Sequence, residues 1–258
     1  MPDTVVAASS AAGLAGLAEL RRVAIVPAYN EELAVPRVID ELRVFDPGLD
    51  IVVVDDGSVD RTAAVAAAKG ARVLRLPFNL GIGGAVQTGF RFAFENDYDV
   101  AVRVDGDGQH DPSQLVRVLE PVLRGEADIA IGSRFASDEG GYRSSRARRV
   151  GIRLLAWVVS RIVGQRLTDT TSGFQAVNRE GIALFARDYP HDYPEVEATV
   201  MVFRHRLRLC EVPVSMRERD SGRSSITALR SVYYMVKVSL AIFVGLFRRN
   251  ITPEEEGK

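Results

Sequence analysis

The first half of the chain alternates short apolar runs with longer stretches of helical character. The apolar runs fall at residues 23–26, 51–54, 72–76, 100–104 and 129–131, and glycine or polar residues follow them. Short continuous apolar runs separated by helices are typical of βαβ units, whose parallel strands are covered on both faces. We therefore expect an α/β domain with a mostly parallel central sheet and helices on both faces.

Residues that start and stop helices mark the segments between these strands. Asn30 is suited to cap a helix that begins at Glu31, because its side chain can accept a hydrogen bond from a free backbone N–H. The other helices of this half are predicted over 61–69, between Asp60 and Gly70, over 84–95, and from Pro112 onward.

The second half is less regular, and it suggests how the chain is divided. A glycine- and arginine-rich loop is predicted over 136–149, followed by helices over 150–163 and near 194–208, a strand over 210–214 and a long apolar helix. We expect a lead-in over 1–20, a catalytic domain over 21–227 and a C-terminal helix over 228–250.

Composition excludes several classes of protein. Of 258 residues 47% are hydrophobic and 26% are charged, and the net charge is −1. These values are typical of a globular protein and argue against a disordered chain or a globally basic nucleic-acid binder. Cys210 is the only cysteine, which excludes internal disulfides and a four-cysteine zinc site.

The longest apolar stretch, residues 232–247, bears on membrane association. It has 16 residues and includes Lys237 and Ser239, whereas a spanning helix needs about 20 apolar residues. Arg248 and Arg249 follow it, as suits an anionic membrane surface. We expect a helix at the membrane interface; a helix packed in the core, on a second copy of the chain or on a membrane-anchored partner is the alternative. The N-terminus, Met1 to Thr4, has no positive region typical of a signal peptide.

Two acids directly after the fourth predicted strand are the most informative motif. Asp105 and Asp107 are separated and followed by glycines, which allow a ligand to approach the backbone. Two carboxylates suit Mg²⁺ or Mn²⁺, with phosphate oxygens as the remaining ligands. The alternative is an ordinary Asx turn. An EF-hand calcium loop starting at Asp105 is excluded because His110 stands where glycine is required. A dinucleotide-binding fingerprint starting at Gly81 is excluded because Val86 stands where its last glycine is required.

Five motifs, each at a predicted strand end, together carry a family resemblance. They are Val26 to Glu32, Val54 to Ser58, Asn79 to Ala85, Asp105 to His110, and Gly132 to Phe135. Their order and spacing resemble family 2 inverting glycosyltransferases of the GT-A fold. Asp107 with Gln109-His110, the segment 169–174, and Gly222 to Ser225 ahead of the apolar helix resemble the dolichyl-phosphate mannose synthase type.

The resemblance implies roles for individual residues. The donor-binding residues would be Pro27, Ala28, Tyr29, Glu31, Asp55, Asp56, Gly83, Asp105 and Gly106, although Tyr29 could instead pack in the core. The metal ligands would be Asp105, Asp107 and Gln109. The catalytic residues would be Asp107 and Arg134, and chemical reasoning adds Asp169 and Glu195 as candidate bases.

Arginines are expected to receive the acceptor phosphate. Arg134 matches a phosphate-binding arginine of similar enzymes, and residues 143–166 contain seven arginines and no acid. The acceptor-phosphate set would be Arg134, Arg148, Arg149, Arg219 and Arg223. An ordinary solvated basic face is the alternative.

The chain also departs from the mannose synthase pattern. Ser225 stands where a lysine is usual, and Ile152 stands where a serine is expected four residues after Arg148. UDP-, GDP- and TDP-sugars therefore all stay open as donors.

These features predict a metal-dependent hexosyltransferase, associated peripherally with the cytoplasmic face of a membrane. Its acceptor would be a polyprenyl phosphate, whose oxygen is already anionic. A hydroxyl of a glycan, metabolite or protein is the alternative acceptor and would need a carboxylate base, for which Asp169, Glu195 and Glu197 are candidates. A third reading is a nucleotide-sugar binder without turnover.

Overall fold

The computed structural model describes residues 20–136, 146–191 and 194–217. The predicted C-terminal helix over 228–250, nearly all of the lead-in over 1–20, and both Arg219 and Arg223 lie outside these ranges. Among the described residues, no helix is both long and apolar enough to cross a bilayer.

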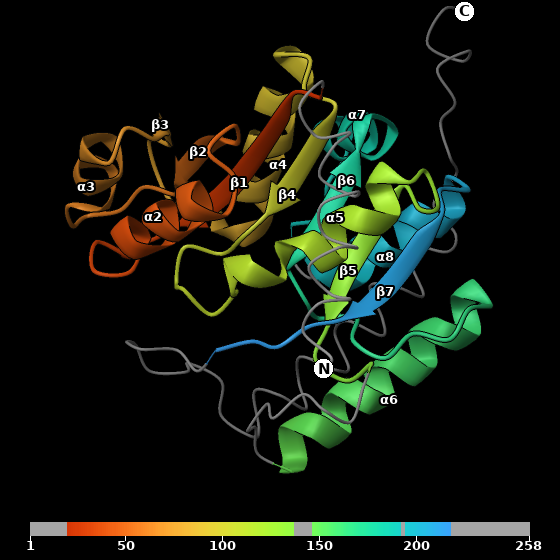
Figure 1. Ribbon diagram of the computed structural model, residues 1–258. Helices are drawn as coiled ribbons and strands as arrows, with labels where there is room; N and C mark the ends of the chain where they lie inside the picture. The colour runs from red at the N-terminus through yellow and green to blue at the C-terminus, as the bar shows by residue number, and fades with distance from the viewer. Residues whose placement is uncertain (1–19, 137–145, 192–193, 218–258) are drawn as a thin grey trace, which may run out of the picture.

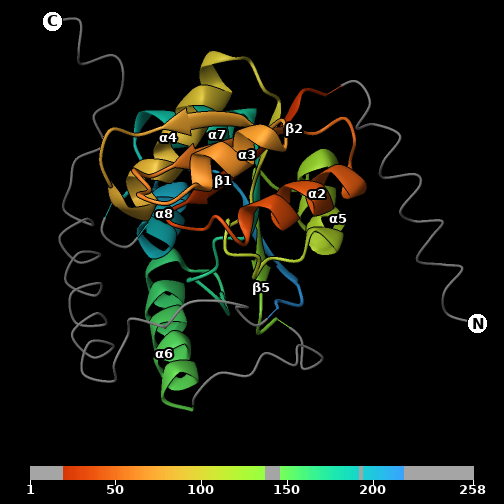
Figure 2. The same cartoon turned by 90° about the vertical axis from the view of Figure 1, so that its left-hand side faces the viewer.

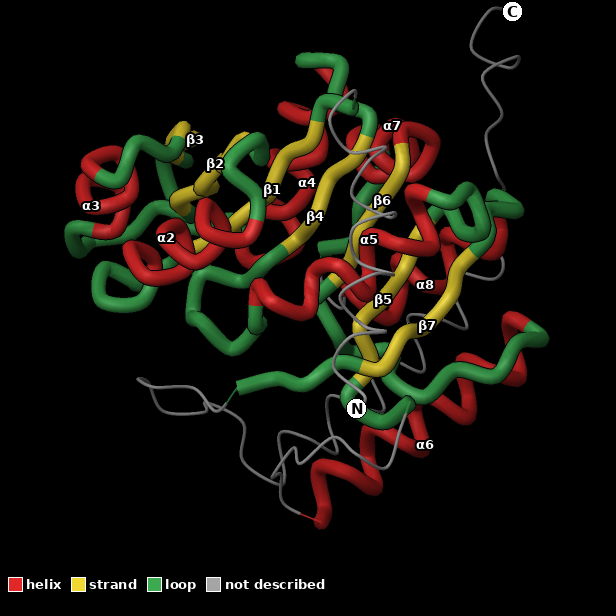
Figure 3. Tube along the Cα trace, in the orientation of Figure 1, coloured by secondary structure: helices red, strands yellow, loops and turns green. Residues whose placement is uncertain are grey.

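A seven-stranded sheet forms the centre of the molecule, with strand order β3-β2-β1-β4-β6-β5-β7 (Figures 1 and 3). The strands are β1 (Arg22–Ala28), β2 (Asp50–Asp55), β3 (Arg72–Arg75), β4 (Val100–Arg103), β5 (Ile129–Ser133), β6 (Gln175–Asn178) and β7 (Leu209–Pro213). All pairings are parallel except those of β6, which runs antiparallel to both β4 and β5. The mostly parallel sheet predicted from the apolar runs is confirmed.

Helices cover both faces of this sheet, as Figure 2 shows with the sheet close to edge-on. The helices are α2 (Val35–Phe45), α3 (Thr62–Ala68), α4 (Gly81–Glu95), the 3₁₀ turn η2 (Pro112–Gln114), α5 (Leu115–Leu123), α6 (Arg146–Val163), α7 (Arg179–Arg187) and α8 (Pro194–Arg204). Alternate strand residues enter two cores: one beneath α4, α7 and α8, the other beneath α2, α3 and α5.

Two parts of the sequence-based prediction need correction. The helix expected from Glu31 begins at Val35, without a side-chain cap. Asn30 does not cap it: its backbone has φ of 55°, and its side-chain oxygen accepts the N–H of Val59 across the neighbouring loop. Strand β6 and helix α7 were not predicted, because a four-residue strand with polar ends gives little apolar signal.

Candidate active site

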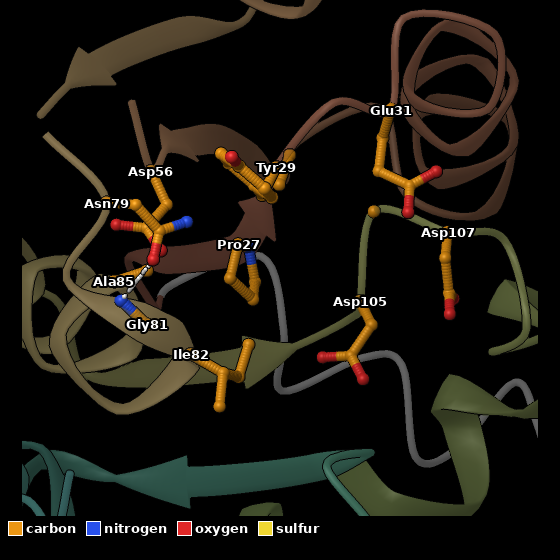
Figure 4. Close-up of a pocket in the computed structure, with 12 residues that line it drawn as sticks. Pro27, Tyr29, Glu31, Asp56, Asn79, Gly81, Ile82, Ala85, Asp105 and Asp107 are labelled. Carbon is orange, nitrogen blue, oxygen red and sulfur yellow. Dashed lines mark hydrogen bonds between the residues drawn. The ribbon is translucent and has the colours of Figure 1, made fainter. Parts of the chain in front are cut away.

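A pocket of about 290 Å³ lies where the loops after β1, β2, β3 and β4 meet (Figure 4). Parallel strands bring their carboxyl ends to one edge of the sheet, which is where open α/β sheets bind ligands. Its walls are formed by Pro27, Ala28, Tyr29, Glu31, Asp56, Asn79, Gly81, Ile82, Ala85, Asp105, Gly106 and Asp107. Most of the predicted donor-binding residues are therefore brought together in one cavity.

The two acids at the end of β2, Asp55 and Asp56, differ in position. Asp56 lines the pocket, and its carboxylate accepts the N–H groups of Leu80 and Gly81 at 2.7 and 2.9 Å. Burial raises the pKa of Asp56, although these two N–H groups oppose the rise. Asp55 is fully buried beneath, where its carboxylate accepts the N–H of Ser58. Asp56 thus faces the pocket, while Asp55 supports the loop.

Tyr29 is exposed at the pocket rather than packed in the core. It is 48% exposed, and Figure 4 shows its ring above Pro27. An aromatic ring in this position offers a flat apolar face to a planar ligand. Gly83, by contrast, is not among the pocket residues: a Cβ there would lie 2.4 Å from the carbonyl oxygen of Pro190, so this glycine lets α4 approach the segment after α7.

The acidic motif forms the opposite wall of the pocket. In Figure 4, Asp105 and Asp107 lie across Pro27 from Asp56 and Asn79. The Asp107 carboxylate accepts the N–H of Gln109 at 3.0 Å, so the Asx turn considered as the alternative is present. The loop that contains this turn also lines the cavity. Gln109 itself is not a pocket residue; its carbonyl oxygen accepts the N–H of Arg217.

Asp105 is held by buried neighbours. The Nε of Arg103 lies 3.2 Å from its Oδ1, and its backbone N–H donates to Nδ1 of His110 at 3.0 Å. Burial by itself would raise the pKa of Asp105, but Arg103, then His110 and Arg134, hold it below the usual range. The carboxylate therefore stays ionised at neutral pH.

His110 is a structural neighbour that the sequence did not assign. Its ring stacks on Phe174, with centroids 4.9 Å apart. Burial lowers the pKa of His110 to about 4, so the imidazole is neutral and can accept the N–H of Asp105. In the sequence, the available sign of this role was the position of His110 in the Gln109-His110 motif. That motif does not identify the group to which the ring is bonded.

Arg134 and Asp169 are engaged with each other. The guanidinium donates to the carboxylate at 2.6 and 2.8 Å, and the Arg134 backbone N–H donates to it at 3.2 Å. Thr171 contributes two further donors to Asp169. The carboxylate of Asp169 is thus held by Arg134 and Thr171, and neither Asp169 nor Arg134 lines the pocket.

Glu195, the remaining catalytic candidate, lies in the first turn of α8. Its Oε1 accepts from Nη2 of Arg103 at 2.9 Å, and its side chain is 18% exposed. Glu197, the third candidate base, is partly buried on the same helix. Arg103 was overlooked in the sequence; the available signal was a single arginine inside the apolar run 100–104.

A second, larger cavity of about 850 Å³ lies along α6. Three arginines, Arg153, Arg161 and Arg166, line it together with Phe135 and Trp157, and its described lining includes no acid. Trp157 is 57% exposed, and the guanidinium of Arg161 lies 5.5 Å from its ring centroid. Of the predicted acceptor arginines, Arg148 and Arg149 belong to the first turns of this helix.

The side chains of the first pocket include groups that could coordinate a metal ion. In the described part of the chain, no cluster of three or more histidine, cysteine or acidic side chains could enclose an ion. Asp105 and Asp107 offer carboxylates from one wall only. Such a partial set fits Mg²⁺ or Mn²⁺ when substrate phosphates complete the coordination, as these hard ions commonly do.

Comparison with known proteins decides the family. The family model described as glycosyl transferase family 2 matches residues 23–189. The chain belongs to this family. The resemblance inferred from the strand-end motifs is thereby confirmed, and the protein is a hexosyltransferase-like enzyme.

Several relatives within the family carry informative names. The chain is 33% identical to undecaprenyl-phosphate mannosyltransferase of Micrococcus luteus, covering 81% of this chain and 88% of that protein. It is 32% identical to polyprenol monophosphomannose synthase of Mycolicibacterium smegmatis, covering 85% and 86%.

A solved structure supports the fold. Glucosyl-3-phosphoglycerate synthase from Mycobacterium tuberculosis, in complex with Mn²⁺, UDP and glucosyl-3-phosphoglycerate, superposes with a TM-score of 0.71 at 22% identity. The match covers 94% of this chain and 85% of that one. At this identity the likeness establishes the GT-A-like fold of the family 2 enzyme.

Proposed function

We propose that this enzyme transfers a hexose, with inversion, from a nucleotide-diphosphate sugar to a polyprenyl phosphate at the cytoplasmic face of a membrane. The observation that carries the proposal is the cavity along α6, whose described lining combines Arg153, Arg161 and Arg166 with Trp157 and includes no acid. Guanidinium groups suit a phosphate, and tryptophan suits the boundary between lipid and water. The names of the relatives from Micrococcus and Mycolicibacterium support the same acceptor class.

The donor would occupy the pocket at the strand ends. Tyr29 offers a ring for the base, while Asp56 and Asn79 lie on the side away from the acidic wall. Asp105 and Asp107 would hold Mg²⁺ or Mn²⁺, and the bound ion would neutralise charge on the leaving diphosphate. Structures of the glucosyl-3-phosphoglycerate synthase with Mn²⁺ or Mg²⁺ and UDP support this assignment.

Arg134 lines neither cavity, but it is related to residues of both. Its charge is among those that lower the pKa of Asp105 against the effect of burial, and the next residue, Phe135, lines the cavity along α6. A phosphate entering from α6 would therefore meet the donor near the end of β5. Arg148, Arg149, Arg219 and Arg223 remain proposed contributors to that phosphate site.

An anionic acceptor also suits the state of the carboxylates. A phosphate monoester oxygen is already a nucleophile near neutral pH, so transfer to it needs no strong general base. Asp169 is bound by Arg134 and Glu195 by Arg103, which leaves neither as an unpaired base. A hydroxyl acceptor would require Asp169 or Glu195 to be released first, or Glu197 to act as the base.

The test is a transfer assay with extraction of the lipid product. The full chain is incubated with labelled UDP-, GDP- and TDP-sugars, Mg²⁺ or Mn²⁺, and a polyprenyl phosphate. We expect metal-dependent label in the organic phase that falls at least 100-fold in Asp107→Asn. Asp97→Asn is the matched control, because Asp97 is an exposed acid paired with Arg179 away from the pocket. Label only in a water-soluble product would instead support the hydroxyl acceptor.

A further inference from the structure

Arg103 is a charged side chain in the interior of the protein. It is the last residue of β4 and is only 1% exposed. Removing a guanidinium from water is costly unless opposite charges and hydrogen bonds replace the lost hydration. The contacts of Arg103 therefore show what its position requires.

Each nitrogen of this guanidinium has a different partner. Nε donates to Oδ1 of Asp105 at 3.2 Å, Nη2 donates to Oε1 of Glu195 at 2.9 Å, and Nη1 donates to the hydroxyl of Tyr189 at 3.3 Å. Burial by itself would lower the pKa of Arg103, but Asp105 and Glu195 raise it above its usual value. The group is a permanent cation that joins β4, its following loop and α8.

The carboxylates of Asp105 and Glu195 lie closer to the protein surface than the guanidinium of Arg103. The side chains of Asp105 and Glu195 are 30% and 18% exposed, with Arg103 beneath them. Gly173 closes another side, since a Cβ there would lie 2.6 Å from Nη2 of Arg103. The segment after Asp169 therefore packs its backbone directly on the guanidinium.

We propose that Arg103 is a positioning residue for sugar transfer, which fixes the carboxylate of Asp105 on the donor side relative to that of Glu195 on α8. This inference rests on the proposed function, because it assigns Asp105 to the donor diphosphate. By lying between two acids, the guanidinium also offsets negative charge beside the proposed site of the anionic donor. Lysine would keep the charge, but its single ammonium cannot reproduce the planar fork that reaches three partners.

The experiment compares Arg103→Lys with Arg22→Lys in the transfer assay. Arg22, like Arg103, is a buried arginine in an ion pair, and its partner is Asp46. It lies at the amino end of β1, away from the pocket. We expect Arg103→Lys to lower kcat at least tenfold while the donor KM changes less than threefold. Arg22→Lys should lower stability with kcat within twofold of the wild type.

A double-variant measurement separates positioning from simple stabilisation. If Arg103 acts through Glu195, then Arg103→Lys should lower kcat much less in a Glu195→Gln background than in the wild type. Folded fraction is checked by circular dichroism at the assay temperature. A kcat for Arg103→Lys equal to that of Arg22→Lys, or fully multiplicative effects in the double variant, would overturn the inference. A wild-type chain that transfers no sugar to any acceptor would overturn the proposed function as well.

Discussion

The guanidinium of Arg134 and the carboxylate of Asp169 form a bidentate ion pair in which neither side chain is more than 7% exposed. The two residues come from the end of β5 and from the segment before β6. Their pairing fixes the segment that carries Thr171 to the end of β5. A residue predicted to bind phosphate and one predicted to act as a base are thus partners.

Removing one member of this pair should be costly. In Asp169→Asn the cation of Arg134 loses its counter-charge, and we expect the free energy of unfolding to fall by about 3–5 kcal/mol. Urea denaturation measures it. The matched control is Asp40→Asn, which removes the largely exposed partner of Lys69 and should cost less than about 1 kcal/mol. Equal losses of unfolding free energy in the two variants would show that the buried ion pair stabilises the fold no more than the exposed one.

The stability of the protein should depend on pH through His110. Its pKa is about 4 when folded, against 6.5 in the unfolded chain. Between these values the unfolded chain binds a proton that the folded chain does not, so stability falls as the pH is lowered from 6.5 to about 4. The loss should reach about 3 kcal/mol.

The variant His110→Asn tests this assignment. An asparagine oxygen can accept the N–H of Asp105 as Nδ1 does, but it does not titrate. Urea denaturation at pH 7 and pH 4.5 should therefore show a smaller loss in the variant than in the wild type. Parallel losses in both proteins would assign the acid sensitivity to other groups.

Removing the aromatic ring at the donor pocket should weaken donor binding. Stacking of a base on an aromatic ring contributes about 1–3 kcal/mol, so Tyr29→Ala should raise the donor KM roughly 5- to 150-fold, and Tyr29→Phe should change it little. Phe94→Ala is the control, because Phe94 is 51% exposed on α4 but does not line the pocket. An unchanged KM in Tyr29→Ala would place the base elsewhere.

Chelation should separate donor binding from folding. With two carboxylates on one wall, the proposed ion would contribute to donor affinity and little to the fold. We expect treatment with EDTA to weaken binding of a nucleotide diphosphate at least tenfold, measured by calorimetry, and to leave the urea midpoint unchanged. Restored binding on adding Mg²⁺ or Mn²⁺ completes the test, and metal-independent binding would contradict it.

Charge on α6 should matter for the lipid acceptor and not for the donor. Replacing Arg153 and Arg161 by glutamine removes two cations from the cavity along α6. Transfer to polyprenyl phosphate should fall at least tenfold, with the donor KM within twofold. Arg91→Gln together with Arg124→Gln serves as a control of equal charge, because both residues are exposed and line neither cavity. An equal fall in both double variants would indicate a general effect of charge.

The sequence identified every strand of the sheet except β6, and the residues at the strand ends, because both depend on local pattern. Apolar runs located β1, β2 and β4, and the polar residues after them line the pocket. The partners of those residues could not be predicted. Arg103 and Glu195 are 92 positions apart, and only the packing of α8 near the end of β4 brings them together.

The helix-start error has a similar cause. Asn30 has the residue type of a helix cap, but it is used instead for a contact with Val59 between two loops. Strand β6 was missed because Gln175 and Asn178 interrupt its apolar character. What makes it a strand is its position between β4 and β5, where neighbours on both sides complete its hydrogen bonds.

The reversed direction of β6 has a consequence for how this enzyme can diversify. The chain leaves the sheet at Ser133 and returns at Gln175, and Ile131 pairs with Gln175 in the ladder, so exit and re-entry are adjacent. The 41 residues between them, which include α6, form an excursion closed at its base. Such an excursion can change length or be exchanged without shifting the strand register. If the proposed function holds, the segment that would receive the acceptor can thus vary while the strands that frame the donor pocket keep their register.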